Sequence, residues 1–160
     1  MKTKSPLSKP CLNLMNIFKY MMEEGYFPNY EYTHISFDLD GTIATVECED
    51  GFASVRIFFS IDKDKYDMFI EASNLTMMKT YAVKPTVMDD RENLIFSIEF
   101  LCDGIRDFRR YFPRSLDCLR DALISHKAEM KRLIEKRNSD AKKVPDTEDL
   151  ISGTIRKILS

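Results

Sequence analysis

The chain has no tryptophan, and among its 160 residues it has only five glycines, two histidines and four cysteines. With so few glycines, there is no glycine-rich loop of the kind that wraps phosphate groups. Cys11, Cys48, Cys102 and Cys118 are widely separated and form no Cys-x-x-Cys pair, so the usual zinc-site and disulfide-framework spacings are missing. We therefore expect reduced thiols, no metal site and no cofactor.

An excess of charge of one sign is also missing. The 24 lysines and arginines nearly balance the 26 aspartates and glutamates, which leaves a net charge of −2 at pH 7. This balance gives no overall basic excess to hold nucleic-acid phosphates, and no apolar run approaches the roughly 18 residues of a membrane span. The first ten residues lack the apolar centre of a secretory signal. Together these absences predict a cytoplasmic protein with no nucleic-acid or membrane partner.

What the chain does contain is a change of hydrophobic period. Residues 11–22 place their apolar side chains three or four apart, which indicates a helix with one buried face. Between residues 33 and 61, apolar and polar residues alternate in three runs, interrupted by Asp40-Gly41 and Asp50-Gly51. Asp-Gly is typical of tight hairpin turns, so this stretch predicts three antiparallel strands. Phe58 breaks the alternation, because it falls on the polar face of its strand.

In the second half of the chain, a helical hydrophobic period is again followed by the alternation typical of strands. A helical stripe covers residues 66–76, and two alternating runs on either side of a polar turn at residues 89–93 predict a second hairpin. From Ile105 the pattern is helical for about eight turns. Its apolar positions form a heptad seam, which suits packing on the sheet or on a second copy of the chain. Pro113 is expected to start or kink this helix, with residues 104–112 forming a separate turn.

The predicted order of elements is therefore helix, three strands, helix, two strands, helix. Because the strands are grouped and joined mostly by tight turns, we expect an α+β domain with a largely antiparallel five-stranded sheet and helices packed on it. We expect residues 1–10 to be flexible and residues 11–136 to form this single domain. Residues 137–160 are predicted to be a polar tail, either disordered or carrying a short docking helix.

One short motif suggests chemistry. Phe37-Asp-Leu-Asp-Gly-Thr42 has the letters of the first motif of the haloacid dehalogenase superfamily. By this likeness Asp38 would be the nucleophile of a small Mg²⁺-dependent phosphatase, and Asp40 its general acid and base. The motif requires a buried central parallel strand, whereas residues 30–36 are half polar and alternating. We keep this phosphatase as the alternative and favour a hairpin turn, in which neither residue is catalytic.

The wider pattern resembles another family. The N-terminal helix ends in Glu23-Glu-Gly-Tyr26, and Phe37 precedes the hairpin glycine Gly41 by four residues. Ala72-Ser-Asn74 leads on to Lys79 and to Val83-Lys-Pro85, and an acidic turn runs into Phe96-Ser-Ile-Glu-Phe100. With the amphipathic last helix, this arrangement resembles the type III secretion chaperone-like fold, and more closely its YbjN-like bacterial relatives, over residues 12–133.

The resemblance implies a protein without catalytic residues, because the family has none to carry over. Secretion chaperones of this fold dimerise and bind extended segments of client proteins on apolar patches, and YbjN-like proteins are linked to regulation. We therefore expect a non-enzymatic protein-binding module, chaperone- or regulator-like, that acts as a homodimer and binds a partner segment through apolar sheet or helix surface. Nine methionines, several in predicted helices, would suit an adaptable surface of this kind, although core filling is the commoner use.

Overall fold

A computed structural model of the chain describes residues 12–141, and its elements begin with helix α1 (Leu14–Glu23). Asn13 caps this helix, because its side-chain oxygen accepts a hydrogen bond from the backbone N–H of Asn16 at 2.9 Å. The helix ends before Gly25, whose φ of +80° is open to glycine without strain. The helical stripe predicted for residues 11–22 is thus a helix with a buried face.

Two tight hairpins join the next three strands, β2 (Ile35–Leu39), β3 (Thr42–Glu49) and β4 (Phe52–Ser60). Both residues of each turn have positive φ: 54° and 85° at Asp40-Gly41, and 47° and 81° at Asp50-Gly51. Positive φ at both central residues is the geometry of a type I′ turn, whose twist matches that of the flanking strands. The hairpins predicted from the two Asp-Gly pairs are confirmed.

The remaining elements are the short 3₁₀ turn η1 (Lys63–Lys65), helix α2 (Tyr66–Lys79), strands β5 (Val83–Val87) and β6 (Asn93–Leu101), and helix α3 (Ile105–Ala141). The sheet is antiparallel throughout, in the order β1-β2-β3-β4-β6-β5. The predicted α+β class and antiparallel sheet are confirmed. The strand count is six rather than five, because a two-residue strand, β1 (Asn29–Tyr30), pairs with the start of β2.

Helix α3 corrects one expectation. It runs without interruption from Ile105 to Ala141, and Pro113 lies inside it, so residues 104–112 do not form a separate turn. Proline has no N–H to donate to the carbonyl four residues earlier, which is that of Arg109. The apolar residues on both sides of Pro113, Phe112 and Leu116, are buried in one core, and their burial holds the helix together across this defect.

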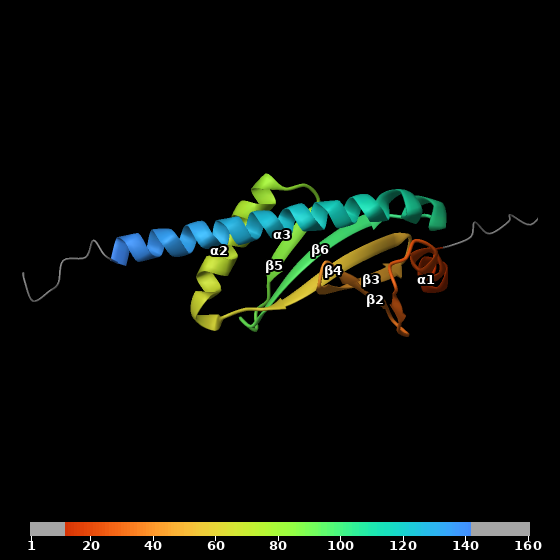
Figure 1. The fold of residues 1–160 in the computed structure, drawn as a ribbon, viewed down its shortest axis with the longest axis horizontal. Coiled ribbons are helices and arrows are strands. Elements are labelled where there is room, and N and C mark those ends of the chain that lie inside the picture. Colours follow the sequence, from red (N-terminus) through yellow and green to blue (C-terminus); the bar gives the residue numbers. More distant parts are fainter. Residues whose placement is uncertain (1–11, 142–160) are drawn as a thin grey trace, which may run out of the picture.

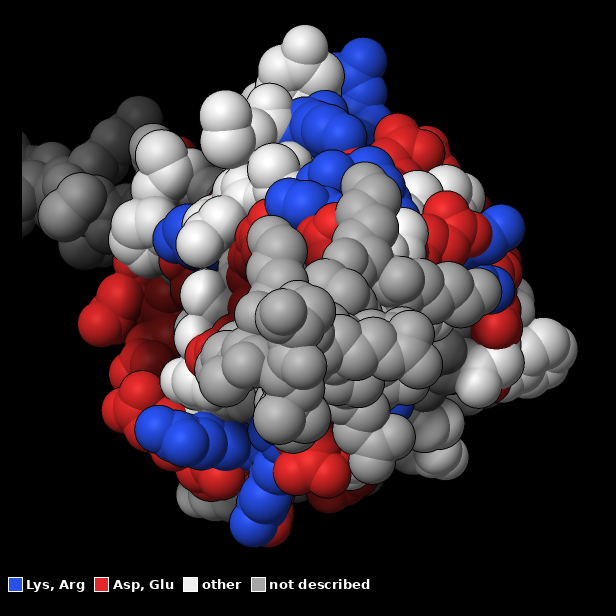
Figure 2. Space-filling view, turned by 90° about the vertical axis from the view of Figure 1, so that its left-hand side faces the viewer, with Lys and Arg blue, Asp and Glu red and all other residues white. Residues whose placement is uncertain are grey.

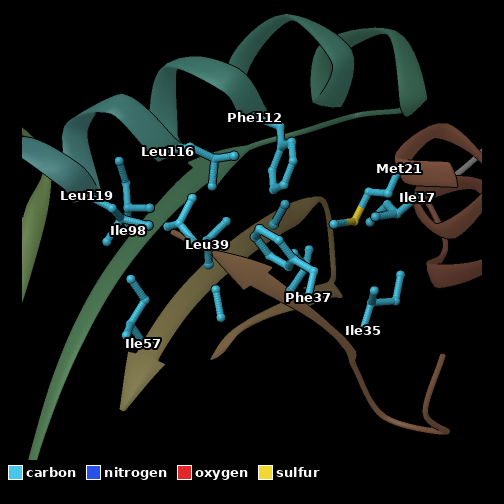
Figure 3. Packing of buried hydrophobic residues seen from close by; sticks show 14 of the residues in the cluster. Ile17, Met21, Ile35, Phe37, Leu39, Ile57, Ile98, Phe112, Leu116 and Leu119 are labelled. Carbon is cyan, nitrogen blue, oxygen red and sulfur yellow. The ribbon is translucent and has the colours of Figure 1, made fainter. Parts of the chain in front are cut away.

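The core lies between the helices and one face of the sheet, called here the inner face (Figure 1). Figure 3 shows Phe112, Leu116 and Leu119 of α3 above Phe37, Leu39 and Ile98 of the sheet, with Ile17 and Met21 of α1 at one end. All eight of these side chains are at most 5 % exposed. Most of the heptad seam of α3 is therefore buried within the chain, whereas its members Leu123 and Met130 are only partly buried.

Helix α3 extends the ordered part of the chain beyond its predicted end, since residues 137–141 are helical. The flexible segment expected at residues 1–10 lies outside the described residues, and so does the rest of the predicted tail, residues 142–160. Among residues 12–141 no helix is long and apolar enough to cross a membrane.

Candidate binding surfaces

An apolar groove lies where α2 and α3 diverge over the end of the sheet. We call it the α2–α3 groove. It encloses about 540 Å³. Its lining is mostly apolar and comes from β4 and the residue after it, α2, β6 and α3: Phe59, Ile61, Phe69, Leu94, Phe96, Leu123 and Met130, with Thr42, Ser60, His126 and Lys127 as polar members. A concave site with an apolar lining and a few polar groups is the usual form of a binding site.

His126 lies at the base of this groove and is almost completely buried. Its ring is stacked on Phe69, with centroids 6.1 Å apart, and meets the edge of Phe96 at 5.2 Å. Its Nε2 lies 3.3 Å from the hydroxyl of Ser73, so the ring has a polar partner on α2. Burial lowers the pKa of His126, and a hydrogen bond to the backbone of Phe69 partly opposes that shift. His126 is thus a neutral structural residue at neutral pH.

The groove continues along the surface of α3. Lys127 and Met130 line it and also line the next hollow, together with Ile124, Ala128, Lys131, Ile134 and Glu135. These residues recur three or four positions apart and so share one side of the helix, opposite the side that packs on α2. Ile124 and Ile134 are exposed there. The apolar surface is therefore continuous from the end of the sheet to the last turns of α3.

One ion pair joins α2 to α3 at the same level, and a second ion pair within α3 shares its carboxylate. The Glu129 carboxylate is buried, and both the Lys79 ammonium of α2 and the Arg132 guanidinium donate hydrogen bonds to it. These hydrogen bonds, Lys79 first, lower the pKa of the Glu129 carboxyl. The bond from Lys79 ties the end of α2 to α3 beside the groove. Glu129 is not among the residues that the sequence patterns single out. A charged residue on the apolar side of a helix is nevertheless a sign of a buried ion pair, and Glu129 has that position.

A second candidate surface is the face of the sheet opposite the helices, called here the outer face. It is formed by side chains of four strands: Ile43, Thr45 and Glu47 of β3; Phe52, Ser54, Arg56 and Phe58 of β4; Ile95, Ser97, Glu99 and Leu101 of β6; and Lys84 and Thr86 of β5. The helices α1, α2 and α3 all pack on the other side (Figure 1).

The outer face is more apolar than a solvated sheet face should be. Four large apolar side chains stand on it with exposed fractions of 62 % for Ile43, 51 % for Phe52, 50 % for Phe58 and 70 % for Leu101. Phe58 lies directly opposite the half-buried Ile95, and Phe52 opposite Leu101. The apolar side chains thus form one patch at each end of β4, separated by a polar belt.

The polar belt between the two patches has charges of both signs. The Arg56 guanidinium is 2.9 Å from the Glu47 carboxylate, and the Lys84 ammonium is 3.4 Å from Glu99. Beside this belt a wide hollow of about 910 Å³ is lined by Glu47, Phe52, Arg56 and Glu99, among others. Since two of its carboxylates already have basic partners, the hollow belongs to the outer face and is no separate cation site.

Charges elsewhere are also mixed. In the end view of Figure 2, blue lysine and arginine side chains and red acidic ones are interspersed over the visible described residues. Among residues 12–141, no three His, Cys, Asp or Glu side chains are grouped so as to hold a metal ion. Burial raises the pKa of the Cys102 thiol to about 11, so this thiol stays protonated at neutral pH.

The two aspartates of the phosphatase motif have structural roles. Asp38 is on β2, and its carboxylate accepts a hydrogen bond from the N–H of Gly41 at 2.9 Å, which closes the hairpin turn. Asp40 is in that turn and forms an ion pair with Arg120 of α3 at 2.6 Å. Strand β2 is antiparallel to both of its neighbours, so no parallel strand presents these carboxylates to a phosphoryl group. Nothing in this arrangement points to a phosphatase.

The chain was compared with known proteins. No family model matches the sequence, and no curated protein matches it either. Among solved structures, YbjN from E. coli, a candidate transcription regulator, superimposes with a TM-score of 0.60 at 12 % identity over 75 % of this chain and 93 % of YbjN. An uncharacterized protein from Methanothermobacter thermautotrophicus is also similar, with a TM-score of 0.46 and 14 % identity over 76 % of this chain and 95 % of the other.

The match to YbjN confirms the YbjN-like fold expected from the sequence. It covers most of the chain at low identity, so it establishes the architecture and carries no residue role. The likeness to type III secretion chaperones is not shown by these matches and stays a prediction.

Proposed function

We propose that this chain is a non-enzymatic protein-binding module, chaperone- or regulator-like, that holds an apolar segment of a partner protein in the α2–α3 groove. The observation that supports the proposal is the continuity of the apolar lining. Lys127 and Met130 line both the groove over the sheet and the hollow farther along α3. The groove between α2 and α3 thus continues as an apolar strip on α3 alone, and a surface of this kind can take the apolar side of an amphipathic segment.

The length of the groove fits a short segment. From Leu123 to Ile134 the helix rises about 17 Å, at 1.5 Å per residue. A partner helix of about three turns covers this distance and presents three or four apolar side chains to the groove. Met130 lies in the middle of this surface, and its flexible thioether can adapt to side chains of different shapes.

The charges along the groove suggest the chemistry of the segment. Lys131 is 4.0 Å from the Glu135 carboxylate. Lys127 forms no ion pair with any residue between positions 12 and 141. An unpaired ammonium at the rim of an apolar groove favours a partner with a carboxylate beside its apolar residues. The proposed segment is therefore amphipathic and carries an acidic side chain that faces Lys127.

A regulatory role would come through such protein contacts. YbjN is a candidate transcription regulator, and this description lends support to a regulatory role here. The balanced charge of this chain disfavours direct DNA binding, so we propose regulation through a protein partner in the cytoplasm.

A photo-crosslinking amino acid placed at position 127 tests the proposal, with the same amino acid at position 78 as its control. Met78 is highly exposed on α2 and lines neither part of the groove. We expect a specific crosslinked protein from the native lysate at position 127 alone. That protein, once identified and purified, should bind the Met130→Glu variant about tenfold or more weakly than wild type, because a carboxylate would stand in the apolar lining.

Met78→Glu is the matched control for the affinity measurement and should bind like wild type. Equal crosslinking at positions 127 and 78, or equal affinities of wild type and Met130→Glu, would rule out this groove as the site.

The phosphatase alternative is tested by measuring hydrolysis of p-nitrophenyl phosphate with Mg²⁺, by wild type and by Asp38→Asn. Turnover in wild type that is lost in Asp38→Asn would contradict a non-enzymatic function.

A further inference from the structure

No helix of residues 12–141 lies over the outer face of the sheet, which exposes two apolar patches that a solvated face does not require. We propose that this face packs on the outer face of a second copy of the chain and forms a sheet-on-sheet dimer. Sheets that pack face to face interlock their side chains at a spacing of about 10 Å. The surface is distinct from the α2–α3 groove, because the two lie on opposite sides of the sheet.

The register of β4 and β6 makes the face complementary to itself. A two-fold axis that runs along the strands, midway between β4 and β6, places β4 of one copy over β6 of the other. Since Phe58 lies opposite Ile95 in the same chain, the axis puts Phe58 over the partner's Ile95. In the same way it puts Phe52 over the partner's Leu101. The exposed phenylalanine of each apolar patch is then covered by an apolar side chain of the partner.

The polar belt fits under the same axis. Arg56 lies opposite Ser97 in its own chain, so in the dimer it stands over the Ser97 position of the other copy, one row from Glu99. Lys84 of β5 is the other neighbour of Ser97 in its own chain. The axis places β5 over β3 of the other copy, so Lys84 stands one row from Glu47 of that copy. Long basic side chains span the distance between neighbouring rows, about 7 Å. Each copy thus offers acids where the other offers bases.

The size of the face predicts a reversible dimer. The central strands β4 and β6 have nine residues each and so run about 30 Å, and four strands side by side are about 19 Å wide. Because β3 has eight residues and β5 only five, the four strands cover about 500 Å² in each copy and about 1,000 Å² in total, the size of a weak interface. We therefore expect monomer and dimer in equilibrium rather than a permanent pair.

The edges of the sheet are less suited to a second copy. Strand β1 at one edge has only two residues. Strand β5 at the other edge has Pro85 at its centre, which lacks a backbone N–H to donate to an added strand. Pairing through an edge would also leave Phe58 and Leu101 in water. The face, rather than an edge, is therefore the surface that a second copy covers.

Sedimentation of the full chain from about 1 µM to about 100 µM, the range in which an interface of this size dissociates, tests the proposal. We expect the mean mass of wild type to rise from 18.7 kDa toward twice that value. Phe58→Lys should stay at the mass of one chain at every concentration, because its ammonium would face Ile95 of the other copy. Tyr81→Lys, the same kind of change at a more exposed aromatic residue outside the face, should dimerise like wild type.

Two further measurements separate this interface from loss of folding and from the partner groove. At about 1 µM, where wild type is mostly monomeric, the circular dichroism of Phe58→Lys should match that of wild type and its melting temperature should differ by only a few degrees, since half of the Phe58 side chain is exposed. A photo-crosslinking residue at position 58 should give a covalent homodimer, and one at position 78 should not. Met130→Glu should dimerise normally. A wild type that stays monomeric, a Phe58→Lys variant that dimerises, or crosslinking at position 58 only to a different protein would overturn the proposal.

Discussion

The imidazole of His126 is stacked on the ring of Phe69, with centroids 6.1 Å apart and planes 19° apart. The contact joins α3 to α2 at the base of the groove, and Ser73 of α2 lies within 3.3 Å of the same ring. Because the ring is buried among aromatic side chains, its neutral form fits the site and its charged form does not. The stability of the α2–α3 contact is therefore linked to the protonation of one residue.

This linkage predicts that stability falls at mildly acidic pH. The pKa of His126 is below its usual 6.5 in the folded chain, so between the two values the unfolded chain binds more protons. Stability from this residue is complete above about pH 6.5 and is lost as the pH falls toward the folded pKa. Urea midpoints of wild type should decrease from pH 7.5 to pH 5.5, and those of His126→Gln should decrease less. Equal slopes for the two proteins would show that His126 is not the titrating group.

The Glu129 carboxylate should stabilise the fold only when it is charged. Its pKa is lowered by hydrogen bonds from Lys79 and Arg132, so its contribution is present above the ordinary value of 4.5 and is lost as the pH falls through the folded pKa. At pH 7, Glu129→Gln should unfold at lower urea than wild type, and the difference between the two midpoints should shrink as the pH falls below 4.5. Glu135→Gln is the control, because Glu135 is exposed and its pair with Lys131 is 4.0 Å long.

Phe112 of α3, which packs on the inner face of the sheet, and Phe58 on the outer face should differ sharply in their contribution to stability. Phe112 is fully buried and is stacked on Phe108, with centroids 4.7 Å apart. Phe112→Ala should lower the free energy of unfolding by about 3–5 kcal/mol, the usual cost of emptying an aromatic site in a core. Phe58→Ala should cost about 1 kcal/mol or less in the monomer, since its ring is half in water. Urea unfolding of the two variants at low protein concentration makes the comparison, and equal losses would contradict the assignment of Phe58 to an open face.

Local signals in the sequence were sufficient for much of the fold. Each Asp-Gly pair requires positive φ at two successive residues, and few local conformations other than a type I′ turn provide it. The alternating runs between the turns then fix which side chains face the core. Phe58, which broke the alternation, was a true sign of an apolar outer face. Strand β1 could not be predicted, because two residues are too short to show a period and the strand exists only through its pairing with β2.

The binding surfaces depend on contacts that sequence patterns do not contain. Phe59, Phe69 and Met130 come from three separate elements and line one groove only because of the angle between α2 and α3. Asp38 and Asp40 show how little a short motif specifies, since its six letters match a phosphatase motif while they form the end of an antiparallel strand and its hairpin turn. A motif specifies side chains, whereas catalysis also depends on the direction of the strand that carries them.

Pro113 interrupts the hydrogen bonding of α3, so replacing it should stabilise the chain. Proline is about 3 kcal/mol less favourable than alanine inside a helix, because it lacks the N–H and its ring crowds the preceding turn. Alanine also frees the unfolded chain, which offsets up to about 1 kcal/mol of the gain. Pro113→Ala should therefore raise the free energy of unfolding by about 2 kcal/mol in urea titrations. Arg114→Ala, at the next exposed position of the same helix, should change it by less than about 0.5 kcal/mol. A lower midpoint for Pro113→Ala would mean that proline at this position is needed to seat Phe108 and Phe112 in the same core.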